Sequence, residues 1–527
     1  MIRYQSQNQI SIEEFQTPFQ LKLNSQNRWV KLSRMLSWDE LATIYYQVMS
    51  TDQGRPGIDA RRIIGAMIIK HKLVLSDEET VMQIQENPYL QYFLGYTSYE
   101  AEPVFSPTLF VEIRKRIGKE KFNEMSTVLI STALKVENAN MKKRSHIKKG
   151  ISTNEGEEQE ENREDSVREE GKDNNGKMLL DATVAEQAIK YPNDLDLLND
   201  CRKASEELID MLFKKTDLTN IPRTYRKEAR KAYLSTAKKK NKNRKEMRKA
   251  IGKQLRYLRR DLKHIEKLLD TPGTGSFPLA AKYQRRYWII QEIYRQQTYM
   301  YDNEVHSCND RIVSMSQPHV RPIVRGKTGK KTEFGSKIGV SMKDGFAIVD
   351  NLSWDAYNES TDLTEQVENY RKRNGCYPQT VIADNIYGNK KNREYMKSKG
   401  IQFSGKPLGR PKKVTDDNKE QLYKEREQRK KQYRERIPIE GKFGQGKNGY
   451  RLNYIRAKLS ETSESWISCI FFVMNLMDLT AKKINSTLNY LKTLIQILNP
   501  GIIPLKNNLI LVDKKIYLST TYSYCTF

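Results

Sequence analysis

Four polar residues recur at regular spacing in one short segment of the chain. Tyr433, Arg436, Glu440 and Lys447 stand at offsets of 0, 3, 7 and 14. On a continuous helix, which turns by about 100° per residue, their side chains would lie within roughly 60° of one another. A face that combines a phenol, two cations and a carboxylate is either solvated surface, which is the commoner case, or a place for chemistry.

The same segment contains residues that oppose a single continuous helix. Pro438 and three glycines (Gly441, Gly444 and Gly446) are poor helix formers, and each interior glycine costs up to about 1 kcal/mol relative to alanine. Two interpretations stay open: a helix that breaks near Pro438, or a new helix that begins there with proline in its first turn. The alignment on one face therefore gains weight only if other acids can meet Glu440.

Two aspartates are the candidates for meeting Glu440. Asp181 follows the apolar run MLL and Asp384 follows TVIA, so we expect each to stand at the end of a short buried strand. An aspartate in that place is often only a turn former. Other aspartates lie close to Asp181 in the sequence, but none of them ends an apolar strand.

Three carboxylates from separate elements would suit a pair of divalent cations. Mg²⁺ prefers oxygen ligands and usually takes only one or two from the protein, which leaves positions for phosphate and water. Two such ions about 3.5–4 Å apart can activate an attacking oxygen and stabilise the leaving oxygen in phosphoryl transfer. Asp181, Asp384 and Glu440 together indicate this chemistry, although none of them does so alone.

The charge of the chain favours a polyanionic partner. Lys+Arg of 92 against Asp+Glu of 65 gives a net charge of +27, and nucleic acid is the commonest partner of such a chain, ahead of a ribosomal or membrane-surface role. Residues 222–264 hold 18 Lys+Arg against 3 Asp+Glu, with Tyr225, Tyr233 and Tyr257 interleaved. Phosphate neutralisation with aromatic contact accounts for this composition, whereas an exposed helical hairpin accounts only for the charge.

Hydrophobic periodicity arranges these residues in an α/β fold. A first strand at 178–181 precedes basic helices at about 195–303, and a β-hairpin follows at 333–352. A helix at 363–373 and a strand at 380–384 come next, before the helical residues that lead into the polar segment. This order is that of an RNase H-like mixed sheet flanked by helices, with a basic helical insertion after the first strand.

Four regions follow from these patterns. Residues 1–140 contain helical runs, including a helix start at Ser76, and form a helical domain for DNA binding or dimerisation. Residues 141–176 are highly charged with few apolar residues, so we expect a flexible linker. Residues 177–490 hold the α/β domain with its insertion, and residues 491–527 form a C-terminal tail.

Composition also bounds the compartment. The five cysteines are scattered without a CxxC pair, which argues against a disulfide framework or a zinc site and fits a reducing compartment. The N-terminus lacks the apolar core of a signal peptide, and the most apolar run, residues 466–477, is too short to span a bilayer. We therefore expect a soluble, cytoplasmic protein with no membrane partner.

Several segments together resemble bacterial insertion-sequence transposases of the DDE class. The run GRPGIDARRIIGAMIIKHKLVLSDEETV is similar to their helical N-terminal domain. The segments LLDATVAEQAIKYPNDLDLLNDCR and VIADNIYGNKKN are similar to those that carry their two aspartates. The segment YRERIPIEGKFGQGK matches their Y-(2)-R-(3)-E-(6)-K signature at all four positions, and the resemblance covers roughly residues 35–135 and 177–480.

The resemblance implies an enzyme that cleaves DNA at the ends of an insertion sequence and joins the freed 3′-hydroxyl to target DNA. Asp181, Asp384 and Glu440 would hold two ions of Mg²⁺ or Mn²⁺, and the other three signature residues would grip the DNA strand beside the cut. The implied partners are double-stranded DNA, both terminal inverted repeats and target, and a second copy of the chain. A catalytically inactive DNA-binding derivative and an RNase H-like nuclease without strand transfer stay open as alternatives.

Overall fold

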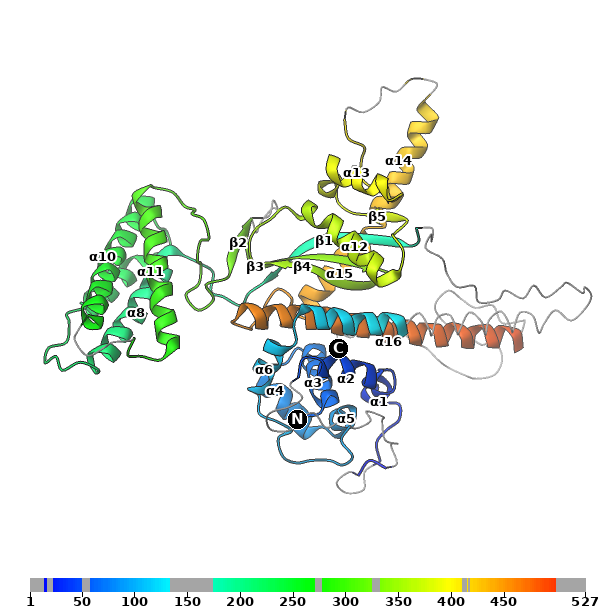
Figure 1. Cartoon of the computed structure of the whole chain (residues 1–527), viewed down its shortest axis with the longest axis horizontal. Coiled ribbons are helices and arrows are strands. Elements are labelled where there is room, and N and C mark those ends of the chain that lie inside the picture. Colours follow the sequence, from blue (N-terminus) through cyan, green and yellow to red (C-terminus); the bar gives the residue numbers. More distant parts are fainter. Residues whose placement is uncertain are drawn as a thin grey trace, which may run out of the picture. The chain divides into compact units, whose positions relative to one another are not determined.

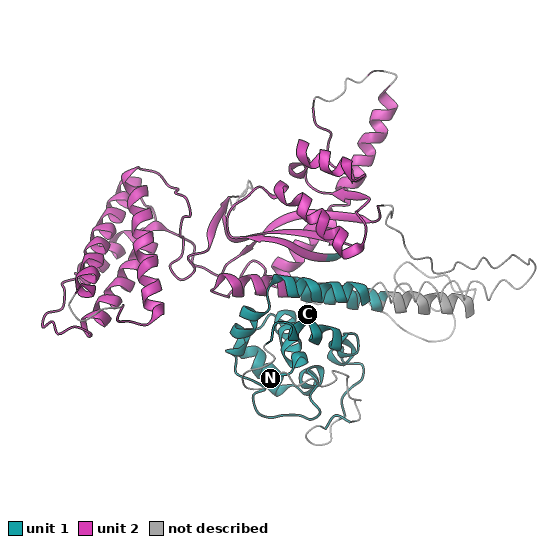
Figure 2. Cartoon of the chain, in the orientation of Figure 1, with its two compact units in different colours: residues 1–172, 344–346, 471–527 teal, residues 173–343, 347–470 magenta. Residues whose placement is uncertain are grey.

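The structure is a computed structural model that describes residues 14–16, 22–49, 57–132, 174–270, 277–324, 332–409, 415 and 418–498. The chain forms two compact units (Figure 2), of which unit 1 comprises residues 1–172, 344–346 and 471–527, and unit 2 comprises residues 173–343 and 347–470. Most of the expected linker at 141–176, and the tail from residue 499 onward, lie outside the described residues. No described helix combines the length and the apolar composition that a membrane span requires.

The described part of unit 1 is mainly helical, apart from its loops and residues 344–346 at the start of β4 (Phe346–Ser353). Its helices are α1 (Arg28–Ser33), α2 (Trp38–Tyr46), α3 (Ala60–Leu73), α4 (Asp77–Glu86), α5 (Pro88–Phe93), α6 (Leu109–Arg116), residues 119–132 and the later part of α16 (Ser460–Leu498). The predicted helix start at Ser76 is confirmed, because its hydroxyl accepts a hydrogen bond of 3.0 Å from the Glu79 amide. The Phe472 ring of α16 packs 6.1 Å from that of Phe122.

Unit 2 contains a mixed sheet (Figure 1). Its strands are β1 (Lys177–Glu186), β2 (Arg321–Val324), β3 (Thr332–Lys343), β4 (Phe346–Ser353), β5 (Thr380–Ile382) and β6 (Gln402–Phe403). The order across the sheet is β2-β3-β1-β5-β6, and β4 pairs with β3. β1 is antiparallel to β3 and parallel to β5, so the central strand joins the two halves of the sheet. This mixed α/β architecture is compatible with an RNase H-like domain.

The predicted hairpin is present as β3 and β4. Asp344 and Gly345 both have positive φ, at 52° and 84°, as a tight two-residue hairpin turn requires. The first strand differs from the prediction. It does not end at Asp181 but continues to Glu186, because its second half pairs with β3 as far as Gly335.

Helices cover one face of the sheet in unit 2. α12 (Leu363–Asn374) and α13 (Lys390–Ser398) follow the short 3₁₀ turns η2 (Glu359–Asp362) and η3 (Asn385–Tyr387). Their buried side chains form one core with Met178 and Leu180 of β1 and with Val381 of β5. Because side chains alternate along a strand, residues 179, 181 and 382 point to the opposite face.

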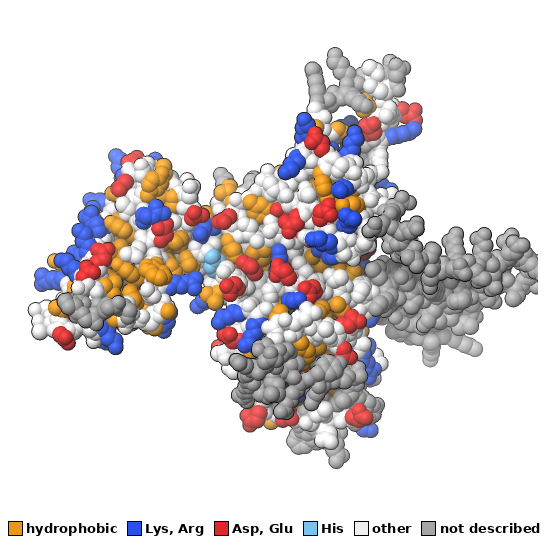
Figure 3. Space-filling view, viewed as in Figure 1, with side chains coloured by type: hydrophobic (Ala, Val, Ile, Leu, Met, Phe, Trp, Pro, Cys, Tyr) orange, Lys and Arg blue, Asp and Glu red, His pale blue; other side chains and the backbone are white. Residues whose placement is uncertain are grey.

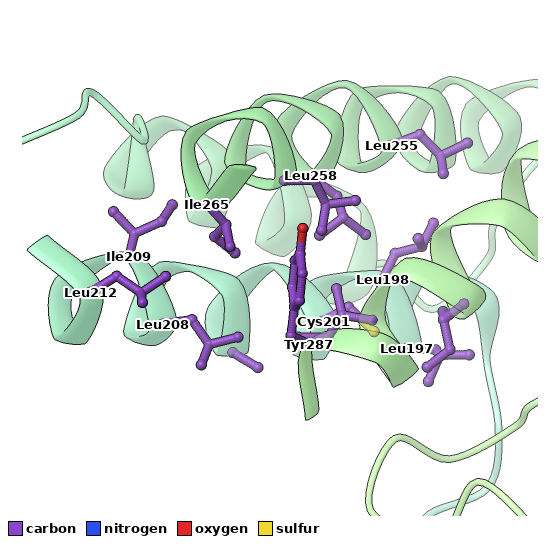
Figure 4. Close-up of a cluster of buried hydrophobic side chains, with 14 of the residues drawn as sticks. Leu197, Leu198, Cys201, Leu208, Ile209, Leu212, Leu255, Leu258, Ile265 and Tyr287 are labelled. Carbon is purple, nitrogen blue, oxygen red and sulfur yellow. The ribbon is translucent and has the colours of Figure 1, made fainter. Parts of the chain in front are cut away.

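Among the described residues between β1 and β2, the chain forms four helices. These are α8 (Asp194–Phe213), α9 (Arg226–Ala237), α10 (Arg244–Leu269) and α11 (Ala281–Asp302). Figure 4 shows that leucine and isoleucine side chains of α8 and α10 meet around Cys201 and Tyr287, and all of these side chains are buried. The helices therefore form a bundle with its own apolar core, which accounts for the predicted helical insertion.

Candidate active site

The register of β1 and β5 brings the two predicted aspartates together. Leu179 of β1 pairs with Ile382 of the parallel strand β5, and Asp181 and Asp384 each lie two residues further along. Both positions therefore fall on the same face of the sheet, on neighbouring chain segments about 4.8 Å apart. The Asp181 side chain accepts a hydrogen bond of 2.8 Å from the Ala182 amide, and that of Asp384 accepts one of 2.6 Å from the Asn385 amide.

The polar segment with the third acid is two helices and not one. α14 (Lys419–Arg434) ends before Arg436, and α15 (Ile437–Gly449) begins directly after it, with Pro438 in its first turn. Of the two interpretations of Pro438, a new helix that starts there is confirmed. The predicted alignment of four side chains on a single helical face is wrong, because Tyr433 belongs to α14 while Glu440 and Lys447 belong to α15.

Arg436 connects the acids across this break. Its guanidinium lies 3.5 Å from the Asp384 carboxylate and also pairs with Glu440, one turn further along the chain. Burial lowers the pKa of Arg436, but the charges of Asp181, Glu440 and Asp384 raise it further, so that the net shift is upward. One cation is thus held by the negative charge of all three predicted acids.

Asp181 is the most deeply placed of the three acids. Burial raises its pKa, and the charges of Glu359 and Glu440 act in the same direction, against the Ala182 amide and the charge of Arg436. Asp384 and Glu440 are instead about half exposed, at 52% and 49% of their side chains. The site therefore has a half-buried floor at Asp181 and an accessible rim.

Glu359 is a fourth acidic residue near the site that sequence reasoning missed. It opens the turn η2, raises the pKa of Asp181 through its charge, and pairs with Lys337 of β3 at 2.7 Å. It neither ends an apolar strand nor belongs to the polar segment, so no local pattern separates it from other surface acids. Its ion pair with Lys337 of β3, and the pairing of β3 with β1, bring it to the neighbourhood of Asp181.

The donor chemistry of the three acids fits hard divalent cations, since carboxylate oxygens are the ligands that Mg²⁺ takes from proteins. Among the described residues, no group of three or more His, Cys, Asp or Glu side chains is arranged closely enough to hold a metal ion. Instead, the Arg436 guanidinium lies between Asp384 and Glu440 and offsets their charge. The three acids thus create a site whose negative charge favours a bound cation.

A basic groove adjoins Asp384. It is a cavity of about 680 Å³ between α14 and the residues that follow β5 and β6, with Asp384 in its wall. Its cationic lining consists of Lys406, Arg426, Arg429, Lys430, Arg434 and Arg436. Tyr433 also lines the groove and exposes 67% of its surface, with the Arg436 guanidinium 5.5 Å from its ring centre.

Lys447 is placed differently from the other signature residues. Its ammonium lies 3.5 Å from the Glu333 carboxylate of β3, and its side chain is largely buried. It does not belong to the described lining of the groove. The structure therefore brings Tyr433 and Arg436 together with the acids, and ties Lys447 to the sheet.

Comparisons with known proteins agree with this picture. Residues 381–477 match the family model of the transposase DDE domain, which includes Asp384 and Glu440 but not Asp181. Residues 18–116 match that of a transposase domain, DUF772. A curated relative, the uncharacterized protein ORF8 in the nfe locus of Rhizobium meliloti, is 31% identical over 115 residues, which are 21% of this chain and 54% of that protein. The chain thus spans about half the length of this relative. No solved structure matches the chain.

Proposed function

The chain belongs to the insertion-sequence transposases of the DDE type, and we propose that it cleaves DNA at the ends of its element and joins the freed 3′-hydroxyl to target DNA. One observation carries the proposal. Arg436 pairs with Asp384 and Glu440 and interacts with the charge of Asp181, although these acids come from separate elements. Arg436 is itself largely buried, with 13% of its side chain exposed, and it stands beside a groove lined with further cations.

In this proposal the N-terminal region and the α/β region that were defined from the sequence have separate roles. Residues 177–490 are the RNase H-like catalytic domain, with the helical insertion at about 195–303. Residues 1–140 are a helical domain for DNA binding or dimerisation, joined through the charged linker at 141–176. The match of a transposase domain to residues 18–116 supports a transposition role for the N-terminal helices.

Asp181, Asp384 and Glu440 are the residues that would hold two divalent ions, Mg²⁺ or Mn²⁺. When bound, the ions supply positive charge that activates the attacking oxygen and stabilises the leaving oxygen. The half-burial of Asp181 matters here, because its raised pKa lets a proton compete with a cation for this carboxylate. We therefore expect metal binding to weaken as the pH falls.

Cleavage and joining are the same reaction with different nucleophiles. In cleavage, the oxygen of a water molecule attacks phosphorus, the bond from phosphorus to the 3′ oxygen breaks, and this oxygen takes up a proton. In joining, the resulting 3′-hydroxyl attacks a phosphorus of the target and releases a 3′-hydroxyl there. Arg436 is suited to fork onto the non-bridging phosphate oxygens, Tyr433 to stack on a displaced base and Lys447 to add charge.

The decisive experiment is Mg²⁺-dependent nicking of duplex DNA that carries the inverted repeats flanking the gene. We expect the wild type to nick this DNA and Asp384→Ala to lose nicking while it retains DNA binding. Asp217→Asn is a suitable control, because it removes an exposed carboxylate elsewhere in the same unit. Equal nicking by wild type and Asp384→Ala would refute the assignment.

Two further measurements separate the alternatives. A nuclease without transferase activity would nick the repeats but would not join pre-cut ends to a second DNA, so a strand-transfer assay distinguishes it from a transposase. An inactive DNA-binding derivative would bind the repeats and show no metal-dependent nicking at all. The basic groove supports DNA contact in all three cases, so binding alone does not discriminate.

A further inference from the structure

One face of α10 carries a row of cations. The helix holds ten Lys and Arg residues against three Asp and Glu residues. Five exposed cations recur at steps of three, four or seven residues, and they are Lys249, Lys253, Arg256, Lys263 and Lys267. With about 100° of turn per residue they fall within roughly 80° of one another. We call these five residues the α10 stripe.

The stripe lies opposite the side of α10 that packs into the bundle. Leu255, Leu258 and Ile265 are buried in the bundle core, and they lie roughly 120° to 180° around the helix from the middle of the stripe. Figure 3 shows Lys and Arg side chains gathered along the outer side of the bundle. The stripe therefore presents its charge to solvent while the opposite side of the same helix holds the fold together.

The stripe is almost free of acids. Asp261 is fully buried on the core side of the helix, and Glu246 and Glu266 lie near its two ends. A solvated helix face normally intersperses both signs of charge. Lys249 and Lys267 are separated by 18 residue steps, so the row is about 27 Å long at 1.5 Å per step, a little less than one turn of B-DNA, about 34 Å.

The tyrosines of this basic region contact other side chains of the bundle, although Tyr225 is 43% exposed. The Tyr233 hydroxyl donates a hydrogen bond of 2.8 Å to Asp196. The Arg260 guanidinium lies 4.5 Å from the ring centre of Tyr225 and 5.1 Å from that of Tyr257. The aromatic contact with nucleic acid stays a prediction for these tyrosines, none of which belongs to the stripe. The stripe offers charge without stacking platforms, which suits a phosphate backbone better than unpaired bases.

We propose that the α10 stripe binds the phosphate backbone of duplex DNA, as a contact additional to the groove beside Asp384. This proposal rests on the proposed function, which supplies duplex DNA as the substrate. Backbone contacts carry no base specificity, so the stripe holds the duplex through charge alone. Each neutralised phosphate contributes about −0.9 to the slope of log K against log salt, which makes the number of contacts measurable.

The test uses the full-length protein without divalent metal, so that no cleavage occurs. Binding to a duplex of arbitrary sequence, three helical turns long, is followed by fluorescence anisotropy over a series of salt concentrations. The triple variant Lys253→Gln, Arg256→Gln and Lys263→Gln removes three stripe cations. We expect the magnitude of its salt slope to fall by about 2.7 relative to the wild type, with an unchanged circular dichroism spectrum.

A control variant removes the same charge from elsewhere in the bundle. Lys203→Gln, Lys214→Gln and Lys215→Gln lie on and just after α8, where all three side chains are exposed. We expect this variant to keep nearly the wild-type slope, because its charges are not in the stripe. Equal slopes for both triple variants would overturn the proposal. It would also be overturned if the stripe variant lost as much of its salt slope on single-stranded DNA of the same length as on the duplex.

The proposal and the proposed function can fail separately. The salt slope is measured without metal and does not depend on Asp384. If the stripe variant has a smaller salt slope while Asp384→Ala nicks DNA like the wild type, DNA binding by the stripe is supported and the proposed cleavage chemistry is refuted. If nicking requires Asp384 but the stripe variant keeps the wild-type salt slope, the cleavage chemistry is supported and DNA binding by the stripe is refuted.

Discussion

Arg436 is the residue on which the charges of the candidate site converge. It stands in the two-residue break between α14 and α15, so its direction is set by the start of one helix and the end of another. It pairs with two acids that are themselves half exposed. Ion pairs with exposed partners add little to stability, about 0–1 kcal/mol, so we expect Arg436 to matter more for DNA binding than for folding.

Replacing Arg436 should lower activity without lowering stability. Arg436→Gln should lower the single-turnover cleavage rate about 100-fold or more, and its thermal unfolding temperature should stay near that of the wild type. Arg436→Lys should recover part of the rate, because lysine restores the charge but not the fork that spans two phosphate oxygens. A Gln variant that cleaves as fast as the wild type would contradict a role in gripping the strand.

At the residue scale, the sequence was sufficient where a residue stands in a local pattern. Asp384 follows a short apolar strand that the structure contains, and Glu440 belongs to the spaced signature. Glu359 has no such pattern and emerges only from the packing of distant segments. Lys447 has the expected spacing, but its pairing with Glu333 depends on β3, more than a hundred residues earlier.

At the scale of elements, α15 raises a question about its glycines. Gly441 and Gly444 have ordinary helical backbones, and an added Cβ would meet no described atom within 4 Å at either position. Neither a turn nor close packing therefore calls for glycine there. Each nonetheless weakens the helix by about 1 kcal/mol relative to alanine. Open space above the helix beside Glu440 is what a closely approaching DNA backbone would need.

Gly441→Ala should therefore separate stability from DNA binding. We expect the unfolding free energy to rise by about 0.5–1 kcal/mol, while affinity for duplex DNA falls because the new methyl group obstructs the backbone. Chemical denaturation and anisotropy measure the two effects. Gly345→Ala is the contrasting control, because its positive φ of 84° makes alanine strained in a place that also has open space. A Gly441 variant that binds DNA normally would remove the functional explanation.

α10 carries its own unusual residue, Asp261. Its carboxylate is fully buried, and within the described structure neither oxygen has a hydrogen-bond partner. Burial and the charge of Glu206 raise the pKa of Asp261 to about 8, against the charges of Arg202 and Arg260. Since the unfolded chain has an ordinary aspartate pKa of about 3.9, the folded state binds an extra proton between these two pH values.

The sign of this linkage is that stability falls as the pH rises through the window from about 4 to about 8. Asp261→Asn should remove that loss, so the variant gains stability over the wild type as the pH increases, by about 1 kcal/mol or more at pH 8. Thermal unfolding at both ends of the window tests this. Glu266→Gln, an exposed change on the same helix, should show no such trend. A stability difference between Asp261→Asn and the wild type that does not change with pH would refute this linkage.

Element boundaries show why sequence reasoning reached the sheet but not its details. The hairpin was predictable because its turn has a local Lys-Asp-Gly signal. The extent of β1 was not, because residues 182–186 become a strand by pairing with β3, which follows them by some 150 residues. The break at Pro438 could be stated only as one of two possibilities, since a proline permits either.

At the scale of the whole molecule, the net charge and the proposed reaction together bear on the oligomeric state. A chain with 27 excess positive charges repels its own copies, while transposition requires two DNA ends to be held together. We therefore expect the protein to be monomeric at low concentration and to assemble as a dimer on DNA. Mass photometry with short duplexes that carry the terminal repeat should show two copies of the chain with two duplexes. A single chain bound to both ends would contradict this expectation.

The pairing of β1 with β5 has a consequence for how such a site can change over time. The two aspartates share a face only because each stands an even number of residues after the paired positions Leu179 and Ile382. One residue inserted between Leu179 and Asp181 would turn the carboxylate into the apolar core around Met178 and Leu180. A second insertion would turn it back. Side-chain parity between Leu179 and Asp181 is therefore one of the conditions for the two carboxylates to share a face, and we expect a single-residue insertion there to abolish cleavage.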